Sequence, residues 1–375
     1  MSFSIPMVDL CGQYQKIKDE VDSALAEVLS QGVFINGGKV QNFQQKLSLF
    51  LHSRHVITCG NGTDALQIAL MALNLRPGDE VITTPFTFVA TAEVVALLGL
   101  KPVFVDVDAD TYNINVSLIE SAITPRTRVI LPVHLFGQCA DMEPLLEIAR
   151  RHNLYVVEDA CQAIGAEYTF SDGRKCMAGT MGNIGCMSFF PSKNLGCFGD
   201  GGAIFTQDDA LAQQLCSIAN HGSTQKYHHE RVGLNSRLDT IQAAVLEVKL
   251  RHLNEYTAAR QAAAATYHRL LSEVPWLKTP VTAPHSTHVY HQYTLRLDSG
   301  DRRSALQQKL TEAGIASMVY YPVPLHLQPA FSAWGYHPGD FPVAEALAQT
   351  VLSLPMHTEL TEEVQRKICN IIIGK

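Results

Sequence analysis

From residue 56 onward, short apolar runs alternate with segments of helical periodicity, and this alternation limits the possible folds more than any other feature. The runs are rich in β-branched residues and apolar on both faces, as in parallel strands that helices cover on both sides. The sequence therefore predicts an α/β fold with a mostly parallel sheet flanked by helices. The expected strands are Val56–Cys59, Glu80–Thr83, Val103–Val107, Val129–His134 and Tyr155–Glu158, and the expected helices are Asp64–Leu73, Ala90–Leu98, Val116–Ala122 and Met142–Arg151.

Further segments extend this unit at both ends. Apolar residues at helical spacing predict a first helix over residues 14–30. After the alternation, Cys186–Phe190 and Gly202–Thr206 are expected to form two strands of a hairpin-like pair. An Ala-rich stretch with few breakers, Leu238–Leu271, is predicted to be one long helix that leads into the next domain.

Pro275, Pro280 and Pro284 mark a boundary after that helix. A chain of 375 residues also exceeds what one hydrophobic core usually serves, which favours two packed units. We therefore expect a large domain over residues 1–250 and, over residues 251–375, the linking helix with a small α+β domain. The elements expected beyond the prolines are a strand His288–Leu297, a helix Arg303–Ala313, a strand Ala316–Tyr321, and helices Val343–Leu352 and Glu362–Ile372.

Charge and composition exclude several classes of partner. Twenty-nine basic against thirty-six acidic residues give a net charge of −7, and no run of Lys and Arg stands out, so a nucleic-acid partner is not expected. No apolar stretch is long enough to span a bilayer, and the first residues lack a secretion signal, so a membrane partner is not expected either. Nine scattered cysteines without a C-x-x-C pair favour a cytoplasmic protein with free thiols.

Four polar patterns follow expected strands, where an open α/β sheet binds its ligands. The first is C-G-N-G-T-D at Cys59–Asp64, between a strand and a helix. Glycines let a backbone approach closely, and amides at a helix N-terminus favour an anion, so Gly62 and Thr63 are candidate phosphate contacts. A tight turn with Thr63 as the helix N-cap is the alternative.

The second and third patterns contain ionisable residues. The strand at 156–158 ends in Glu158 and Asp159, and such a carboxylate can be a metal ligand, a base, the partner of a cationic ring nitrogen, or a helix cap. Lys193 follows an aromatic strand between proline and small residues. Partial desolvation there would lower the pKa of its amine and free it for Schiff-base chemistry, although an exposed loop lysine is the commoner case.

The fourth pattern is the loop Val232–Asp239, which enters the long helix. Its polar cluster contains Asn235 and Arg237, which could bind a phosphate or a carboxylate. It could equally cap the helix, with a surface arginine.

Together, these patterns match the requirements of pyridoxal phosphate. The cofactor needs a seat for its phosphate, an acid for its ring nitrogen and a lysine, here 34 residues beyond that acid. The sequence resembles the sugar aminotransferases related to DegT, DnrJ, EryC and StrS, which have the aspartate-aminotransferase fold type. The resemblance covers nearly the whole chain and is borne by the motifs Q-G-V-F-I-N-G, N-G-T-D-A-L, T-x-F-x-F-x-A-T, E-D-A-C-Q, S-F-F-P-S-K-N, G-D-G-G, N-S-R-L-D and Y-P-x-P-L-H.

The resemblance implies a role for each matching residue. Lys193 would form the Schiff base with the cofactor, and Asp159 would pair with the ring nitrogen. The remaining cofactor contacts would be Gln162 near the ring hydroxyl, Phe86 stacked on the ring, Gly62, Thr63 and Ser188 at the phosphate, and Asn235 reaching the phosphate from a neighbouring subunit. A homodimer with shared active sites follows from the last of these.

The resemblance also implies a reaction. Glutamate would donate its amino group, the cofactor would pass through its pyridoxamine phosphate form, and a keto nucleotide-sugar would accept the amine. The segments Asp9–Tyr14 and Tyr321–His326 look most like the branch that acts on 3-keto sugars linked to UDP or dTDP, whose products serve in amino-sugar and surface polysaccharide biosynthesis.

Substrate contacts match the family less closely. Arg237 could meet an anionic group of either substrate. Tyr320 and Tyr321 stand where several relatives have His-Tyr-Pro, so Tyr320 departs from the pattern, and His326 is a further candidate contact. His285, His288 and His291 recur every three residues, but that spacing in a loop and strand would not gather them on one face, so no metal site is expected.

Four alternatives to a 3-keto sugar aminotransferase can be compared with the sequence. A sugar dehydratase of the same fold would have histidine in place of Lys193, and a 4-keto sugar aminotransferase is a further alternative. A non-enzymatic regulatory protein would be expected to have lost the lysine, the acid or the phosphate loop. A dinucleotide-dependent oxidoreductase needs G-x-G-x-x-G, but Ala65 occupies the third glycine position.

Overall fold

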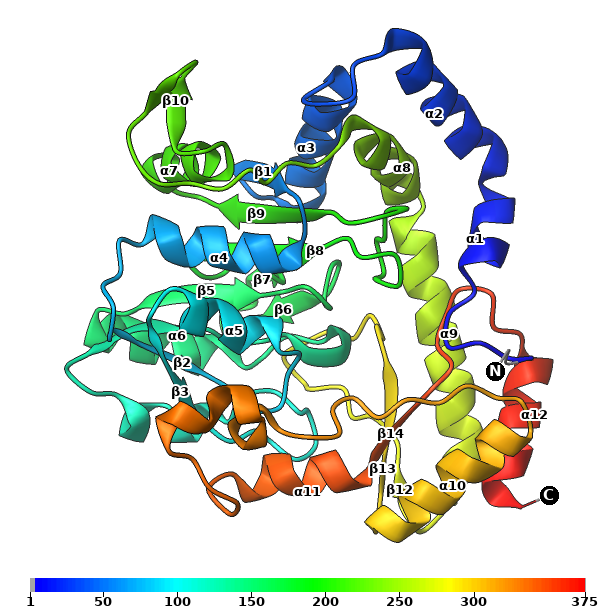
Figure 1. The fold of residues 1–375 in the computed structure, drawn as a ribbon. Helices are drawn as coiled ribbons and strands as arrows, with labels where there is room; N and C mark the ends of the chain where they lie inside the picture. The colour runs from blue at the N-terminus through cyan, green and yellow to red at the C-terminus, as the bar shows by residue number, and fades with distance from the viewer. Residues whose placement is uncertain (1–3, 375) are drawn as a thin grey trace.

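The computed structural model describes residues 4–374 and is built around one seven-stranded sheet (Figure 1). Its strand order is β1-β9-β8-β5-β4-β2-β3. Strands β3, β2, β4, β5 and β8 are parallel, whereas β9 runs antiparallel to both β8 and β1, as a hairpin-like pair requires. The strands are β1 (His55–Cys59), β2 (Glu80–Thr83), β3 (Lys101–Phe104), β4 (Thr127–Ile130), β5 (Tyr155–Asp159), β8 (Ile184–Ser188) and β9 (Gly202–Thr206).

Helices cover both faces of this sheet, which confirms the predicted α/β architecture. One face packs against α4 (Gly62–Ala72), α5 (Ala90–Leu97) and α7 (Asp209–Ala219). The other packs against α3 (Gly38–Leu51), α6 (Met142–His152) and α8 (Thr240–Arg251). Each strand is therefore buried on both sides, which explains its continuous apolar sequence.

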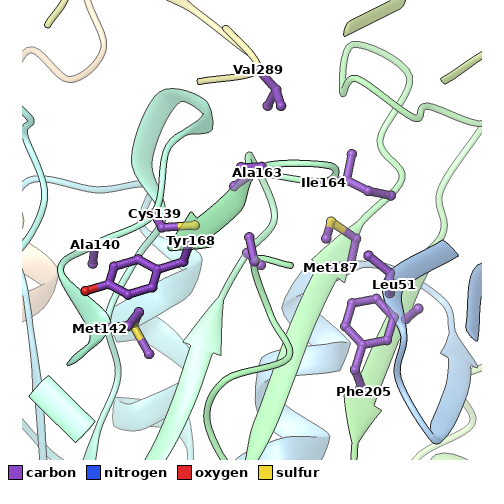
Figure 2. Close-up of a cluster of buried hydrophobic side chains, with 14 of the residues drawn as sticks. Leu51, Cys139, Ala140, Met142, Ala163, Ile164, Tyr168, Met187, Phe205 and Val289 are labelled. Atoms are coloured by element: carbon purple, nitrogen blue, oxygen red, sulfur yellow. The ribbon is translucent and has the colours of Figure 1, made fainter. Parts of the chain in front are cut away.

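The core on the α3 side is dense and apolar. Figure 2 shows Met187 of β8 and Phe205 of β9 beside Leu51 at the end of α3, all within 1% of full burial. Burying a side chain of this size contributes about 1.5–3 kcal/mol to stability. This core stabilises the sheet whose strands carry the loops of the site.

A second unit forms around a small antiparallel sheet. It contains β12 (Leu277–Lys278), β13 (Tyr293–Leu297) and β14 (Val351–Leu354), and it lies at one end of the molecule with the orange and red helices of Figure 1. The helices of this part are α9 (Leu253–Leu271), α10 (Gly300–Glu312), α11 (Pro342–Thr350) and α12 (Glu362–Ile373). The predicted boundary between residues 250 and 251 falls near the end of α8 and stays a prediction.

The N-terminal segment contacts both units. Helix α2 (Lys18–Gln31) packs on α8, and α1 (Leu10–Lys16) precedes it. Ile5 instead packs in the core of the C-terminal unit and forms a bridge with Ile315. The remaining strands form two short hairpins, β6 (Glu167–Thr169) with β7 (Lys175–Met177) and β10 (Ser223–Gln225) with β11 (His228–His229).

The structure corrects several predicted elements. The single long helix is two helices, because the His252 N–H bonds to the Lys249 carbonyl at 3.1 Å in a tighter turn and interrupts the helix. Residues 316–321 form no strand beyond a bridge from Met318 to Ser353, and β14 was not predicted. Residues 116–122 form two 3₁₀ turns, Val116–Leu118 and Glu120–Ala122. Among residues 4–374, no helix is long and apolar enough to cross a membrane.

Candidate active site

A cavity of about 800 Å³ opens at the carboxyl ends of the central strands. Its wall combines the loops that follow β1, β2, β5 and β8 with residues 318–322 of the C-terminal unit. Parallel strands bring distant loops to one edge of a sheet, which is where open α/β folds place their ligands. Segments from both units therefore meet at a single concave site.

The start of α4 forms a narrow backbone cradle in this cavity. Gly62 and Thr63 line it, and the Asn61 side chain caps the helix by accepting the Asp64 N–H at 2.8 Å. A Cβ atom on Gly62 would lie 2.7 Å from the Cβ of Ser188, so only glycine fits. The cap is therefore Asn61 and not Thr63, and the first amides of the helix stay available to an anion.

Lys193 lies in the loop after β8 and lines the same cavity. Its main-chain N–H donates to the Phe190 carbonyl at 2.8 Å, and the neighbouring Asn194 amide donates to the Val289 carbonyl at 2.9 Å. Burial lowers the pKa of the Lys193 amine below its ordinary value, while the charge of Asp159 partly opposes the shift. The neutral amine needed for Schiff-base chemistry is thus favoured.

A second lysine holds this loop in place. The Nζ of Lys249, on α8, donates to the Gly196 carbonyl at 2.6 Å and is almost completely buried. Burial lowers the pKa of Lys249 to about 8, because desolvation disfavours its charged form. The same loop is close-packed at Gly196, where a Cβ would come within 2.3 Å of the Pro191 carbonyl oxygen.

Asp159 ends β5 and also lines the cavity. Its main chain is fixed from both sides, because its N–H donates to the Pro132 carbonyl and its carbonyl accepts the His134 N–H, both at 2.9 Å. Its carboxylate accepts the Cys161 N–H at 3.2 Å and the Thr91 hydroxyl at 2.8 Å. The side chain is 6% exposed and points one acidic group into the site.

The adjacent Glu158 has a different role. It is fully buried and accepts hydrogen bonds from the ring of His134 at 2.8 Å and from the backbone of Gly179, Met181 and Gly182. A buried carboxylate with this many donors is satisfied structurally and has little capacity left for a ligand. Of the two acids that the sequence singles out, only Asp159 faces the cavity.

Gln162 and Tyr321 close the site from the two units. The Gln162 side chain accepts the Phe136 N–H at 2.9 Å and donates to the Tyr321 hydroxyl at 3.1 Å. Both side chains line the cavity, and so does Tyr320. Burial raises the pKa of Tyr321 well above its ordinary value, so this hydroxyl keeps its proton and can donate.

Of the two phenylalanines in the loop after β2, Phe88 lines the cavity and the predicted Phe86 does not. Phe86 is fully buried and packs against Tyr112 and Tyr321, with ring centroids 6.3 and 6.1 Å away, so it does not line the cavity. Phe88, two residues later, lines the cavity and is 54% exposed. The loop is irregular here, so its turn and not a strand periodicity decides which ring faces the ligand.

Three other predicted residues lie elsewhere. His326 is buried, contacts Glu345 at 3.1 Å and meets the ring of Phe341 edge to face, and it does not line the cavity. The ring of His326 therefore lies outside the cavity wall of this chain, and its contact with a substrate stays a prediction. Asn235 and Arg237 are also absent from the cavity wall of the described chain, although the intervening Ser236 accepts the Gly60 N–H at 2.8 Å.

Some residues of the site were missed from the sequence. Thr87 and His291 line the cavity, and Thr91 contacts Asp159. Burial lowers the pKa of His291 well below its ordinary value, so its ring is neutral. The threonines stand inside the motif T-P-F-T-F-V-A-T, which was the available signal, whereas no local pattern marks His291. Among residues 4–374, no group of His, Cys, Asp and Glu could hold a metal ion.

These groups fit pyridoxal phosphate. Lys193, Asp159 and the backbone cradle at Gly62 lie on the wall of one cavity, although 131 residues separate Gly62 from Lys193. Because no Cβ fits on Gly62, its backbone lies directly against Ser188, and the first amides of α4 are exposed at the cavity wall for an anion. The phosphate, the ring nitrogen and the carbonyl carbon of the cofactor each find a matching group.

Comparison with known proteins is consistent with this geometry. The sequence profile of the DegT/DnrJ/EryC1/StrS aminotransferase family matches residues 15–373. The chain belongs to that family. Its members depend on pyridoxal phosphate, and the recognition made from the motifs is confirmed.

Individual relatives cover almost the whole length of the chain. A protein named pleiotropic regulatory protein, from Geobacillus stearothermophilus, is 50% identical over 97% of this chain and 96% of its own. The UDP-2-acetamido-2-deoxy-3-oxo-D-glucuronate aminotransferase of Pseudomonas aeruginosa is 48% identical over 97% and 98%. The crystal structure of DesV from S. venezuelae, in complex with a ketimine intermediate, superposes with a TM-score of 0.94 at 41% identity and covers 100% of this chain and 98% of its own.

Proposed function

We propose that this chain is a pyridoxal-phosphate-dependent aminotransferase that moves the amino group of glutamate to a keto nucleotide-sugar. The favoured acceptor is a 3-keto sugar linked to UDP or dTDP, and the product serves in amino-sugar and surface polysaccharide biosynthesis. The observation that supports this most is the buried Lys193 on the same cavity wall as Asp159 and the start of α4. Relatives named as aminotransferases of 3-oxo and 3-amino nucleotide sugars support the acceptor.

Different residues of this chain would bind different parts of the cofactor. When bound, pyridoxal phosphate supplies an electron-withdrawing ring that stabilises negative charge on the substrate carbon. Gly62, Thr63 and Ser188 would hold its phosphate, Asp159 its ring nitrogen and Gln162 its ring hydroxyl. We propose Phe88 for the ring face, since Phe86 is packed in the core.

Lys193 would supply both the link to the cofactor and the proton transfers. Burial lowers the pKa of its amine, which favours the form that can take a proton from one carbon and return it to another. The loop contacts of Asn194 and Gly196 keep the lysine from swinging away. Tyr321, whose hydroxyl stays protonated, would orient an oxygen of the cofactor or sugar.

The charge of the cavity supports a homodimer. Among the lining residues of this chain, Lys193 is the one lysine or arginine, and it faces the carboxylates of Asp64, Asp159 and Asp200. Glutamate, a nucleotide diphosphate and the cofactor phosphate are all anionic, so they need cations from another source. Arg237 is partly exposed outside the cavity and is suited to serve the site of a second copy.

The surface beside Arg237 also fits a second copy. Val33, Phe34 and Ile35 are 45–48% exposed, and Ile35 forms a bridge with Asp239 at the end of the Arg237 loop. Exposed apolar side chains next to Arg237, which does not line the cavity of its own chain, suit a protein–protein interface. We propose that Asn235 and Arg237 complete the partner subunit's cavity.

A cytoplasmic location fits the thiols. All nine cysteines are free in the structure, and five of them are buried. Free thiols persist in a reducing compartment.

Spectroscopy with the intact protein tests the proposal. Protein loaded with pyridoxal phosphate should show a visible absorbance band that glutamate bleaches, and Lys193→Ala should lack this band. Bleached protein should then aminate 3-keto nucleotide sugars faster than 4-keto ones. A bound cofactor that glutamate leaves untouched would contradict the donor, and amination of 4-keto sugars alone would contradict the acceptor.

The same measurement addresses a regulatory function, which the name of the Geobacillus relative brings to mind. A protein that had lost its enzymatic role could lose Lys193, Asp159 or the phosphate cradle at no cost. This chain keeps all three on one cavity wall. Absence of any cofactor band would favour the regulatory alternative.

A further inference from the structure

We infer that Thr91 and Thr87 are positioning residues for Asp159: their hydroxyls form a hydrogen-bond chain that holds the carboxylate as an acceptor toward the cofactor ring. This inference rests on the proposed function, because it takes Asp159 as the partner of the ring nitrogen. It adds two side chains, both on the segment after β2, to the group that controls the charge of the ring.

The hydrogen bonds that join Thr87, Thr91 and Asp159 are short and buried. The Thr91 hydroxyl donates to Oδ2 of Asp159 at 2.8 Å, and the Oγ1 atoms of Thr87 and Thr91 are 3.1 Å apart. Thr87 is 1% exposed and Thr91 is fully buried, so bulk water does not compete for these bonds. The other carboxylate oxygen, Oδ1, accepts the Cys161 N–H.

Counting the protons shows which hydroxyl donates in each hydrogen bond between Thr87, Thr91 and Asp159. An ionised carboxylate only accepts, so the single proton of Thr91 must point to Asp159. The Thr91 oxygen can then only accept from Thr87, and Thr87 becomes the donor. A proton on Oδ2 of Asp159 would reverse both bonds and leave the proton of Thr87 without an acceptor among the described side chains.

The chain also couples two parts of the site. Thr87 lies between the core ring Phe86 and the cavity ring Phe88, and Thr91 stands in the first turn of α5. Sixty-eight residues separate Thr91 from Asp159, so their contact depends on β2, β4 and β5 being neighbours. The hydrogen bonds thereby fix the position of the loop that carries Phe88 relative to the strand that carries Asp159.

The test uses the full-length protein loaded with pyridoxal phosphate that carries ¹⁵N in its ring. Thr91→Val keeps the side-chain shape and removes the hydroxyl, whereas Thr91→Ser keeps the hydroxyl. In Thr91→Val we expect the ring-nitrogen NMR signal to move toward that of unprotonated pyridine. Bleaching by glutamate should slow by about tenfold or more, as expected when a charged group loses a buried hydrogen bond. Thr91→Ser should restore the signal.

A nitrogen signal that Thr91→Val leaves unchanged, in folded protein that binds the cofactor, would overturn the inference. If Thr91→Val does not fold, Thr87→Val decides. It removes only the far donor, so a smaller shift in the same direction is expected, and no shift overturns the inference. Failure of the proposed function would look different, because wild-type protein would then bind no cofactor or ignore glutamate.

Discussion

The backbone cradle at the start of α4 allows a sharp test, because the chain contains its own control. Gly62 is the first residue of α4 and Gly38 is the first residue of α3. A Cβ on Gly62 would lie 2.7 Å from the Cβ of Ser188 and 3.0 Å from the Sγ of Cys161, whereas a Cβ on Gly38 would meet nothing within 4 Å. Gly62→Ala and Gly38→Ala therefore add the same methyl group. At Gly62 other atoms already occupy the space, whereas at Gly38 the space is open.

The expected magnitudes follow from this difference. Carbon atoms pack about 3.5–4.0 Å apart, so the new methyl at Gly62 is about 1 Å too close to Ser188. Such overpacking costs about 1–3 kcal/mol. Alanine in place of a helical glycine gains about 0.5–1 kcal/mol through the unfolded chain, and this gain is common to both variants. The two variants should thus differ in stability by about 1–3 kcal/mol, with Gly62→Ala the weaker.

Two assays read the result. Thermal unfolding of cofactor-free protein, at one scan rate, should give a lower Tm for Gly62→Ala than for wild type and a slightly higher one for Gly38→Ala. Titration with pyridoxal phosphate should give weaker binding for Gly62→Ala and unchanged binding for Gly38→Ala. Equal Tm values and equal cofactor affinities in the two variants would refute the cradle.

Two further predictions concern the lysine loop and the partner. Because the folded pKa of Lys249 is lowered to about 8, the unfolded chain binds more protons between pH 8 and 10, so the free energy of unfolding should rise there with pH. Lys249→Met should lack this rise in urea titrations at pH 7.5 and 9.5, and parallel pH profiles would count against it. Mixing inactive Lys193→Ala with Asn235→Ala/Arg237→Ala should restore about a quarter of the wild-type sites if cavities are shared between random dimers. If the mixture regains no activity after the dimers are dissociated and reassociated, Asn235 and Arg237 do not complete the partner subunit's cavity.

Much of the fold could be predicted because strand and helix are encoded locally. The runs at β2 and β9 have the bounds that their sequence predicts, and both strands are buried along their whole length. The break at His252 could not be foreseen, because no proline or glycine marks it. Strand β14 was hidden because Val351–Leu354 is short and follows a helical pattern without a breaker.

Local sequence patterns predict the chemical groups of the site: a glycine cradle before a helix, an acid after a strand and a lysine after an aromatic strand. Each depends on residues that are neighbours along the chain, so local patterns suffice. The packing of distant segments is needed to see that Phe88 and not Phe86 faces the cavity, that His326 is buried, and that Thr91 contacts Asp159. In irregular loops the direction of a side chain is set by what packs behind it, and those partners come from distant parts of the sequence.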